Sequence, residues 1–182
     1  ILINNDTNRI DHKWVVEHSK TDVRDLVLIL SRKFKDRGYR TQREFLSVVA
    51  SFVQSMAYKI PASDRLTRSG TMIRTGGVTM PIETLYRGYG DCDTKSLLFA
   101  SILANFPSQR IIFLMGDKHL FVGVRSIPRH NEHYVNIRGT KYILIELTKP
   151  WPIGRIPQKA WVNCGRNVYR TAVVVNTAAA RS

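Results

Sequence analysis

The chain has 182 residues, 43% of them apolar, and is therefore long enough to bury a core without disulfides or bound metal. At this length we expect a single domain, residues 1–182. No apolar run approaches the ~20 residues of a membrane-spanning helix, so we expect no transmembrane segment. The net charge of +14 favours an anionic surface or polymer as a partner, and the basic residues are spread along the whole chain. Because no nucleic-acid motif is recognisable, we interpret this charge as a steering field rather than as the function.

Residues 1–58 are predicted to be mainly helical. A short strand-like stretch, 13–17, precedes a helix over about 21–35, in which apolar residues recur at helical spacing. A second helix is expected to begin at a capping box, where Thr41 and Glu44 satisfy each other's backbone donors. Its apolar stripe continues to Met56, and we interpret it as core rather than as a cofactor site.

Residues 60–80 are predicted to be irregular, because prolines, serines and glycines recur along them. A connection of about 20 residues is longer than usual, which favours a functional loop. Since the segment carries arginines and ends directly before a cysteine block, we expect it to form a basic wall of a substrate cleft. The alternative is an ordinary surface loop.

The block PIETLYRGYGDCDTKS, residues 81–96, places a cysteine at the start of a predicted helix. Asp91 is expected to cap this helix by accepting a backbone N–H, and an apolar run, 97–103, follows Cys92. A thiol on the first helical turn faces unpaired N–H groups and the positive end of the helix dipole, which favour thiolate over thiol. We therefore predict that Cys92 is a nucleophile, the alternative being a small buried hydrophobic residue.

The rest of the chain is predicted to form strands. The expected strands are 110–115, 118–127, 133–137, 141–147 and 168–175, with a tight turn at 138–140 and a frayed tail at 177–182. Helices followed by antiparallel strands indicate an α+β domain, with the helices on one side of the sheet. The catalytic helix and sheet are thus expected within 81–176.

Two of the predicted strands carry the partners that a cysteine nucleophile needs. His119 and Glu146 follow Cys92 at equal intervals of 27 residues, which leaves room to finish the helix and return as neighbouring strands. A glutamate inside an apolar strand is costly unless it has a partner, and His119 is the obvious one. Cys92, His119 and Glu146 are therefore predicted to meet as nucleophile, base and orienting acid.

At these residues the chain resembles the transglutaminase-like cysteine hydrolase superfamily, particularly its bacterial and archaeal members. Three blocks carry the resemblance in the same order: P-x-E-T-L-x-x-G-x-G-D-C-x-D-x-S, then G-H-x-x-V-G-V, then E-x-T with a following tryptophan and I-G-x-x-P. This chain departs from them at two places, with Thr94 where the second acid usually stands and Lys118 where a glycine often precedes the histidine. In this chain they begin at Pro81, His119 and Glu146. The resemblance implies a papain/transglutaminase-like core, a Cys-His-Glu triad, and cleavage of an amide bond in a protein or peptide through a thioacyl-enzyme.

Three further residues are assigned by their position. Tyr58 stands where relatives carry an aromatic residue, so it is expected to line the cleft or to donate to an oxyanion, or else to pack. Trp151 is expected to cover the site or the edge of the sheet. Cys164 is interpreted as a bystander thiol.

Other functions stay open. The same machinery would cross-link proteins if an amine replaced water, and a catalytically silent interaction module is kept because Asp93 directly follows the cysteine and Lys118 precedes the histidine. A polyanion-binding protein is the third alternative.

No motif requires a metal or another cofactor. Since the chain starts at Ile1, we expect a fragment or a processed protein, in the bacterial envelope or exported rather than cytoplasmic.

Overall fold

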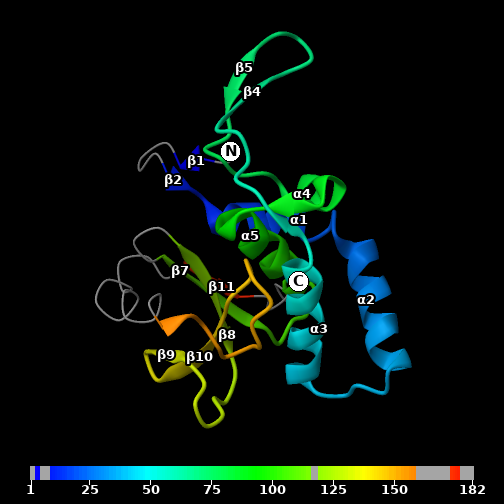
Figure 1. The fold of residues 1–182 in the computed structure, drawn as a ribbon, viewed down its shortest axis with the longest axis vertical. Helices are drawn as coiled ribbons and strands as arrows, with labels where there is room; N and C mark the ends of the chain where they lie inside the picture. The colour runs from blue at the N-terminus through cyan, green and yellow to red at the C-terminus, as the bar shows by residue number, and fades with distance from the viewer. Residues whose placement is uncertain (1–2, 5–8, 116–118, 159–172, 177–182) are drawn as a thin grey trace, which may run out of the picture.

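The structure is a computed structural model that describes residues 3–4, 9–115, 119–158 and 173–176. Within these residues, five helices and an antiparallel five-stranded sheet form a mixed α+β fold (Figure 1). The predicted α+β class is confirmed. Cys164, the predicted tail at 177–182 and residues 168–172 of the last expected strand lie outside the described residues.

Helix α1, His12–Ser19, occupies the stretch that was expected to be strand-like. The Asp11 side chain caps it by accepting the Trp14 N–H at 2.9 Å, and Val15 and Val16 are fully buried. The prediction of a strand over 13–17 is wrong, because this cap and the burial of two consecutive valines against other helices outweigh their β propensity.

Helices α2, Arg24–Asp36, and α3, Gln42–Gln54, lie side by side along one flank (Figure 1). The start of α2 falls at Arg24 rather than near residue 21. The predicted capping box of α3 is confirmed: Glu44 N–H donates to Thr41 Oγ1 at 3.2 Å, and Thr41 N–H donates to Glu44 Oε2 at 2.8 Å.

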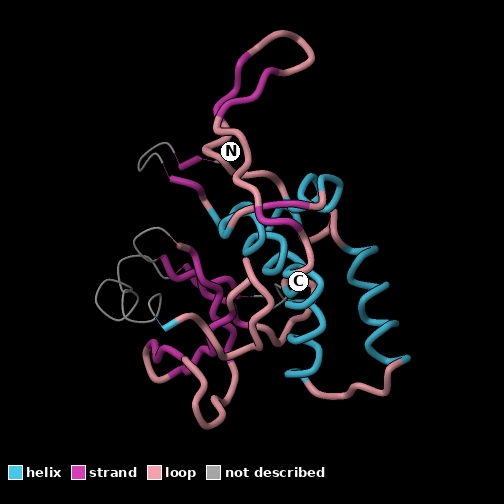
Figure 2. Tube along the Cα trace, in the orientation of Figure 1, coloured by secondary structure: helices cyan, strands magenta, loops and turns pink. Residues whose placement is uncertain are grey.

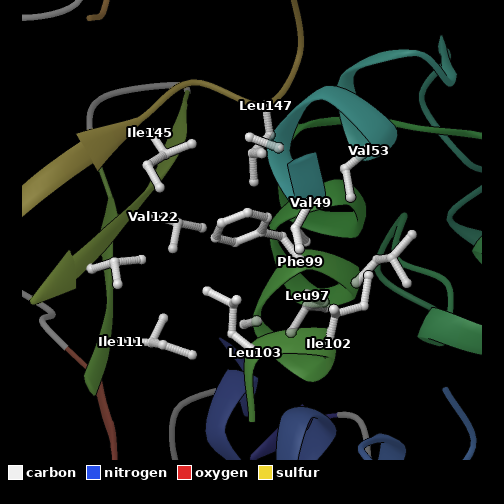
Figure 3. Close-up of a cluster of buried hydrophobic side chains, with 14 of the residues drawn as sticks. Val49, Val53, Leu97, Phe99, Ile102, Leu103, Ile111, Val122, Ile145 and Leu147 are labelled. Atoms are coloured by element: carbon white, nitrogen blue, oxygen red, sulfur yellow. The ribbon is translucent and has the colours of Figure 1, made fainter. Parts of the chain in front are cut away.

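Helix α5, Cys92–Leu103, forms the centre of the molecule, and most of its residues are buried. It contacts α1, α3 and α4, Pro81–Arg87, and also strand β8, Leu120–Arg125, of the sheet. Figure 3 shows Phe99 and Leu103 directed at Val122 and Ile111 of the sheet, while Val49 approaches α5 from helix α3. This packing, rather than its own amphipathic pattern, holds the cysteine-bearing helix in place.

The main sheet has the strand order β11-β7-β8-β10-β9, with every neighbouring pair antiparallel. Its strands are β7 Arg110–Met115, β8 Leu120–Arg125, β9 Tyr134–Ile137, β10 Thr140–Ile145 and β11 Val173–Asn176. Alternate residues serve two clusters: Ile111 and Phe113 join the helices, whereas Ile112 and Leu114 pack on the opposite face. The described helices therefore cover one face of the sheet, as predicted.

Short strand pairs complete the fold. β1 Ile3–Asn4 pairs with β2 Arg9–Ile10, and β3 Ala57–Tyr58 pairs in parallel with β6 Tyr89–Gly90. The segment 60–80, predicted to be irregular, contains an antiparallel hairpin of β4, Asp64–Leu66, and β5, Met72–Arg74. The hairpin projects from the body (Figure 2), so its tip does not form the expected cleft wall. The prolines, serines and glycines on either side of these three-residue strands had favoured the prediction of irregular structure.

Candidate active site

Cys92 is the first residue of α5 and a half-buried free thiol. Asp91 caps the helix, since its Oδ1 accepts the Thr94 N–H at 3.0 Å. The first N–H groups of a helix have no partner within it, so Cys92 lies where backbone donors and the helix dipole favour negative charge. The predicted placement of the thiol on the first turn of a helix is confirmed.

Two glycines bring the chain to this helix. Helix α4, Pro81–Arg87, ends at Gly88 in the left-handed conformation (φ 67°), which glycine adopts without a steric penalty. A Cβ on Gly90 would lie 2.8 Å from Thr94 Cγ2, so only glycine allows strand β6 to pass this close to α5. The spacing of the cysteine block therefore has a local physical reason.

His119 and Glu146 lie at adjoining ends of two paired strands. His119 directly precedes β8, Glu146 directly follows β10, and the register places Ile145 opposite Val122. Their side chains are joined by a contact of 2.9 Å between His119 Nε2 and Glu146 Oε2. The sequence placed both residues inside strands. Each instead lies one residue beyond the end of its strand, where its side chain need not point to alternate faces of the sheet as strand residues do.

The Glu146 carboxylate is almost completely buried and is paired at both oxygens. While Oε2 contacts His119, Oε1 accepts the Thr148 N–H at 2.7 Å and the Thr148 hydroxyl at 2.6 Å. A buried carboxylate is tolerated when it is hydrogen-bonded in this way. Thr148 therefore fixes the orientation of Glu146, and Glu146 fixes that of the His119 ring.

The electrostatics of this pair favour a protonated imidazole. Burial by itself would lower the pKa of His119, but its interactions with Cys92 and Glu146 raise that pKa to about 10. Burial would raise the pKa of Glu146, yet the hydrogen bonds from His119 and Thr148 hold it below its usual range. At neutral pH the pair is thus an imidazolium beside a carboxylate.

Asp93 adds a second acid next to the thiol. Its Oδ1 lies 3.9 Å from Cys92 Sγ, a weak contact, and burial together with the charge of Asp91 raises the pKa of Asp93 to about 6. The positive charge of His119 acts in the opposite direction. Cys92, Asp93 and His119 therefore share one electrostatic environment.

Tyr58 and Trp151, the other two expected site residues, have different surroundings. Tyr58 lies on β3 opposite Gly90, and burial followed by the negative charges at Cys92 and the nearby acids raises the pKa of its phenol. Strand β3 therefore lies beside the segment that leads into Cys92, while the Tyr58 side chain is 55% exposed. Trp151 is 37% exposed; its backbone carbonyl accepts from the Gln54 amide at 2.8 Å, and its N–H donates to the Lys149 carbonyl at 2.8 Å. Covering of the site by the Trp151 ring stays a prediction.

Two residues of the site were not found from the sequence. Gln54, the last residue of α3, donates its side-chain amide to the backbone carbonyls of Glu146 at 2.7 Å and Trp151 at 2.8 Å. Lys95, one turn beyond Cys92, is fully buried (0% exposed), and its Nζ donates to the Met56 carbonyl at 2.7 Å. Their partners are 39 to 97 residues away, so no local pattern indicates these roles.

The described residues contain no cluster of three or more histidine, cysteine or acidic side chains placed to hold a metal ion. In the same part of the chain, no helix is both long and apolar enough to cross a membrane. A groove of about 880 Å³, lined by Lys33, Arg37 and Arg129 among others, does not include Cys92 or His119. The site at Cys92 brings a thiol, an imidazole and carboxylates together, whereas the side chains that line this groove include no cysteine or histidine.

Comparison with family models, with curated proteins and with solved structures finds no match to this chain.

Proposed function

We propose that this protein is a cysteine hydrolase, a peptidase or amidase, with a transglutaminase-like core. The observation that carries the proposal is the His119–Glu146 pair at 2.9 Å, whose imidazole also interacts with the Cys92 thiol at the start of α5. A nucleophile, a base and a group that orients the base constitute the minimal machinery of thiol-dependent acyl transfer.

In the proposed reaction, Cys92 attacks the carbonyl carbon of an amide while His119 holds the thiol proton. The carbonyl oxygen becomes an oxyanion, and His119 gives its proton to the leaving nitrogen as the C–N bond breaks. Glu146 keeps the imidazole in the productive orientation and favours its charged form. Water then attacks the thioester, and His119 accepts a proton from that water, so the acid is released and the thiol is restored.

The oxyanion would be stabilised at the start of α5. The Cys92 N–H is one donor of the type that such sites use, because it stands at the positive end of a helix. Tyr58 is the candidate for a second donor, since its phenol lies in the electrostatic environment of Cys92. The phenol of a tyrosine is protonated at neutral pH, as a donor must be, and the raised pKa of Tyr58 keeps it so.

The likeness of the three sequence blocks to transglutaminase-like hydrolases supports the same proposal. Their residues carry Cys92, His119, Glu146 and Thr148, and the contacts between Glu146 and Thr148 give the E-x-T pattern a physical role. Cross-linking remains the alternative outcome, because an amine in place of water would attack the same thioester. A silent interaction module is the alternative without chemistry.

Thiol labelling tests the proposal. In a Cys164→Ser background, Cys92 should react with iodoacetamide and with a peptide chloromethyl ketone near neutral pH, as measured by the mass of the adduct. His119→Ala should slow this labelling about tenfold or more, because the thiolate loses its cationic partner. His130→Ala, which changes an exposed histidine, provides the matched control and should label normally.

A pH profile of labelling that His119→Ala leaves unchanged would mean that the two residues do not act together, and the domain would then be a scaffold. Hydrolysis and cross-linking are separated with unfolded casein and a fluorescent primary amine. We expect peptide fragments, or ammonia released without incorporation of the amine. Incorporation of the amine, which releases ammonia as well, identifies a transglutaminase. Cys92→Ala should abolish either product.

A further inference from the structure

Large apolar side chains that remain exposed are unevenly distributed over the described residues. Seven of the thirteen lie between residues 58 and 86, in the segment that precedes α5 in the chain. Single exposed apolar residues are normal at protein surfaces, but their concentration in one region marks a contact surface. Tyr58 and Ile60 belong to this group and follow α3 directly, whereas Leu66 and Met72 lie further out, on the β4–β5 hairpin.

The hairpin exposes its apolar residues as a pair. Leu66 and Met72 are opposite each other in the β4–β5 register, and they are 63% and 64% exposed. Cross-strand neighbours lie on the same face, so the two side chains form one apolar patch. Among the described strands, β4 and β5 pair only with each other, and the hairpin projects from the body (Figure 2). Nothing in the described fold covers the patch.

The base of the hairpin is nevertheless held firmly. The Thr75 hydroxyl donates to the Ala62 carbonyl at 2.7 Å, which closes the base. Arg65 Nη1 contacts Glu83 Oε1 at 2.6 Å, and this ties β4 to helix α4. Since α4 leads through β6 to Cys92, the hairpin is connected to the candidate active site by short, bonded segments.

The charges on this surface are mainly positive. Arg68 has no acidic partner in the described structure, and Arg74 has only a contact of 3.9 Å with Asp64, both side chains being exposed. Lys59 lies over the Tyr89 ring, 4.8 Å from its centroid, rather than beside an acid. A partner that complements the surface must therefore offer apolar side chains together with negative charge.

We infer that the hairpin arm, residues 62–75, docks an extended polypeptide substrate whose acidic and apolar side chains reach Arg68, Arg74, Leu66 and Met72. That this polypeptide is a substrate rests on the cysteine hydrolase function proposed for the protein. Docking outside the active site would allow the protein to select long acidic polypeptides over small amides, because only a long chain can occupy both places at once.

Binding is tested first, with the Cys92→Ala chain so that no turnover occurs. The probe is a random copolymer of glutamate and tyrosine, and its affinity is measured by fluorescence anisotropy. The double change Leu66→Ser with Met72→Ser should weaken binding about tenfold, because the apolar contacts are lost. The control changes Leu28→Ser with Ile29→Ser, a pair of similar exposure on α2, and should leave the affinity unchanged.

The charge contribution has its own matched pair of variants. Arg68→Glu with Arg74→Glu should weaken copolymer binding about tenfold or more at moderate salt. Lys33→Glu with Arg37→Glu makes the same change of charge at the C-terminal end of α2 and should have a much smaller effect. Equal losses in the two pairs would mean that binding follows net charge alone, which overturns the assignment to the hairpin. Tighter binding of duplex DNA than of the copolymer through the same arginines would also overturn it.

Turnover separates this inference from the proposed function. The hairpin variants should cleave casein with a higher KM, while iodoacetamide labelling of Cys92 keeps its rate. If Cys92 labels normally but the hairpin variants bind the copolymer as the unchanged chain does, only the docking surface is disproved. If Cys92 and His119 prove uncoupled while the hairpin variants lose binding, the surface stands and the hydrolase does not.

Discussion

Gln54 and Glu146 lie 92 residues apart in the chain, and the Gln54 amide donates to the Glu146 backbone carbonyl at 2.7 Å. The same amide nitrogen donates to the Trp151 carbonyl at 2.8 Å. The last residue of α3 thus holds both the strand end that carries the acid and the segment beyond it. Through Thr148 and His119, this fixed strand end sets the geometry of the whole candidate site.

Gln54→Leu should therefore impair the site more than the fold. One partly buried and one exposed carbonyl lose their donor, which should lower the free energy of unfolding by about 1–3 kcal/mol and slow casein turnover and Cys92 labelling. The control is Gln42→Leu, at the other end of the same helix, where the amide donates to Gln109 and to the Arg125 carbonyl. It should cost similar stability, seen in urea unfolding, and leave labelling intact. Equal loss of labelling in both variants would assign Gln54 a purely structural role.

Glu146→Gln should lower the pKa of His119 from about 10 toward the ordinary 6.5, because the carboxylate charge that favours the imidazolium is removed. The change is read from the pH titration of the His119 ring signals by NMR. Turnover should fall about 100-fold, since the neutral amide no longer stabilises the charged ring. Glu132→Gln breaks a partly buried ion pair with Arg43 and serves as the control. A His119 titration unaffected by Glu146→Gln would contradict the pairing.

Lys95→Met should separate stability from activity. Burial is the main reason that the pKa of Lys95 lies below its usual range, although the charge of Glu146 opposes this effect. Removing a fully buried ammonium relieves its desolvation but leaves the Met56 carbonyl without its donor, so unfolding free energy should change by only about 1–2 kcal/mol. Cys92 labelling should slow, because the Met56–Tyr58 segment loses its anchor to α5.

Ser101→Ala, another buried polar position on α5, is the control for Lys95 and should leave labelling unchanged. Lys95→Arg keeps the positive charge but replaces the ammonium with a guanidinium, and so tests whether Cys92 labelling depends on the shape of the cation. A loss of several kcal/mol in Lys95→Met, with normal labelling of the folded fraction, would identify Lys95 as a packing residue only.

His12 should make the fold sensitive to acid. Burial lowers the pKa of this residue despite the opposing effect of Asp11, and its ring packs on Phe113 with centroids 5.1 Å apart. The unfolded chain binds a proton near the ordinary pKa of 6.5, whereas the folded chain resists it, so stability is present above 6.5 and is lost as the pH falls below it. His12→Leu should flatten this pH dependence in thermal melts between pH 5 and 7. His130→Leu, at an exposed position, should not.

Several features of the fold were accessible from the sequence because their causes are local. The Thr41–Glu44 capping box lies within one helical turn, and the start of α5 is marked by Asp91 and two glycines whose roles depend on adjacent residues. The strand over 110–115 matches its prediction at both ends. Even the contact between His119 and Glu146 was predictable, since a lone acid in an apolar strand requires a partner.

The short elements escaped prediction because tertiary contacts decide them. Two valines made 13–17 resemble a strand, yet a cap at Asp11 and burial on neighbouring helices form α1. The β4–β5 hairpin has strands of only three residues, which leave no periodic pattern to detect. In both places the competing local preferences differ by little, so the surrounding packing determines the conformation.

By itself, the sequence determined the fold class, the helix that begins at Cys92, and the three residues proposed for catalysis. Only the tertiary structure revealed that Gln54 and Lys95 anchor the site and that Leu66 and Met72 remain uncovered on a projecting hairpin. The difference has a physical cause. Caps, turns and hydrophobic periodicity act over a few residues and can be recognised in a sequence. A hydrogen bond across 39 to 97 residues depends on where the whole chain places two segments.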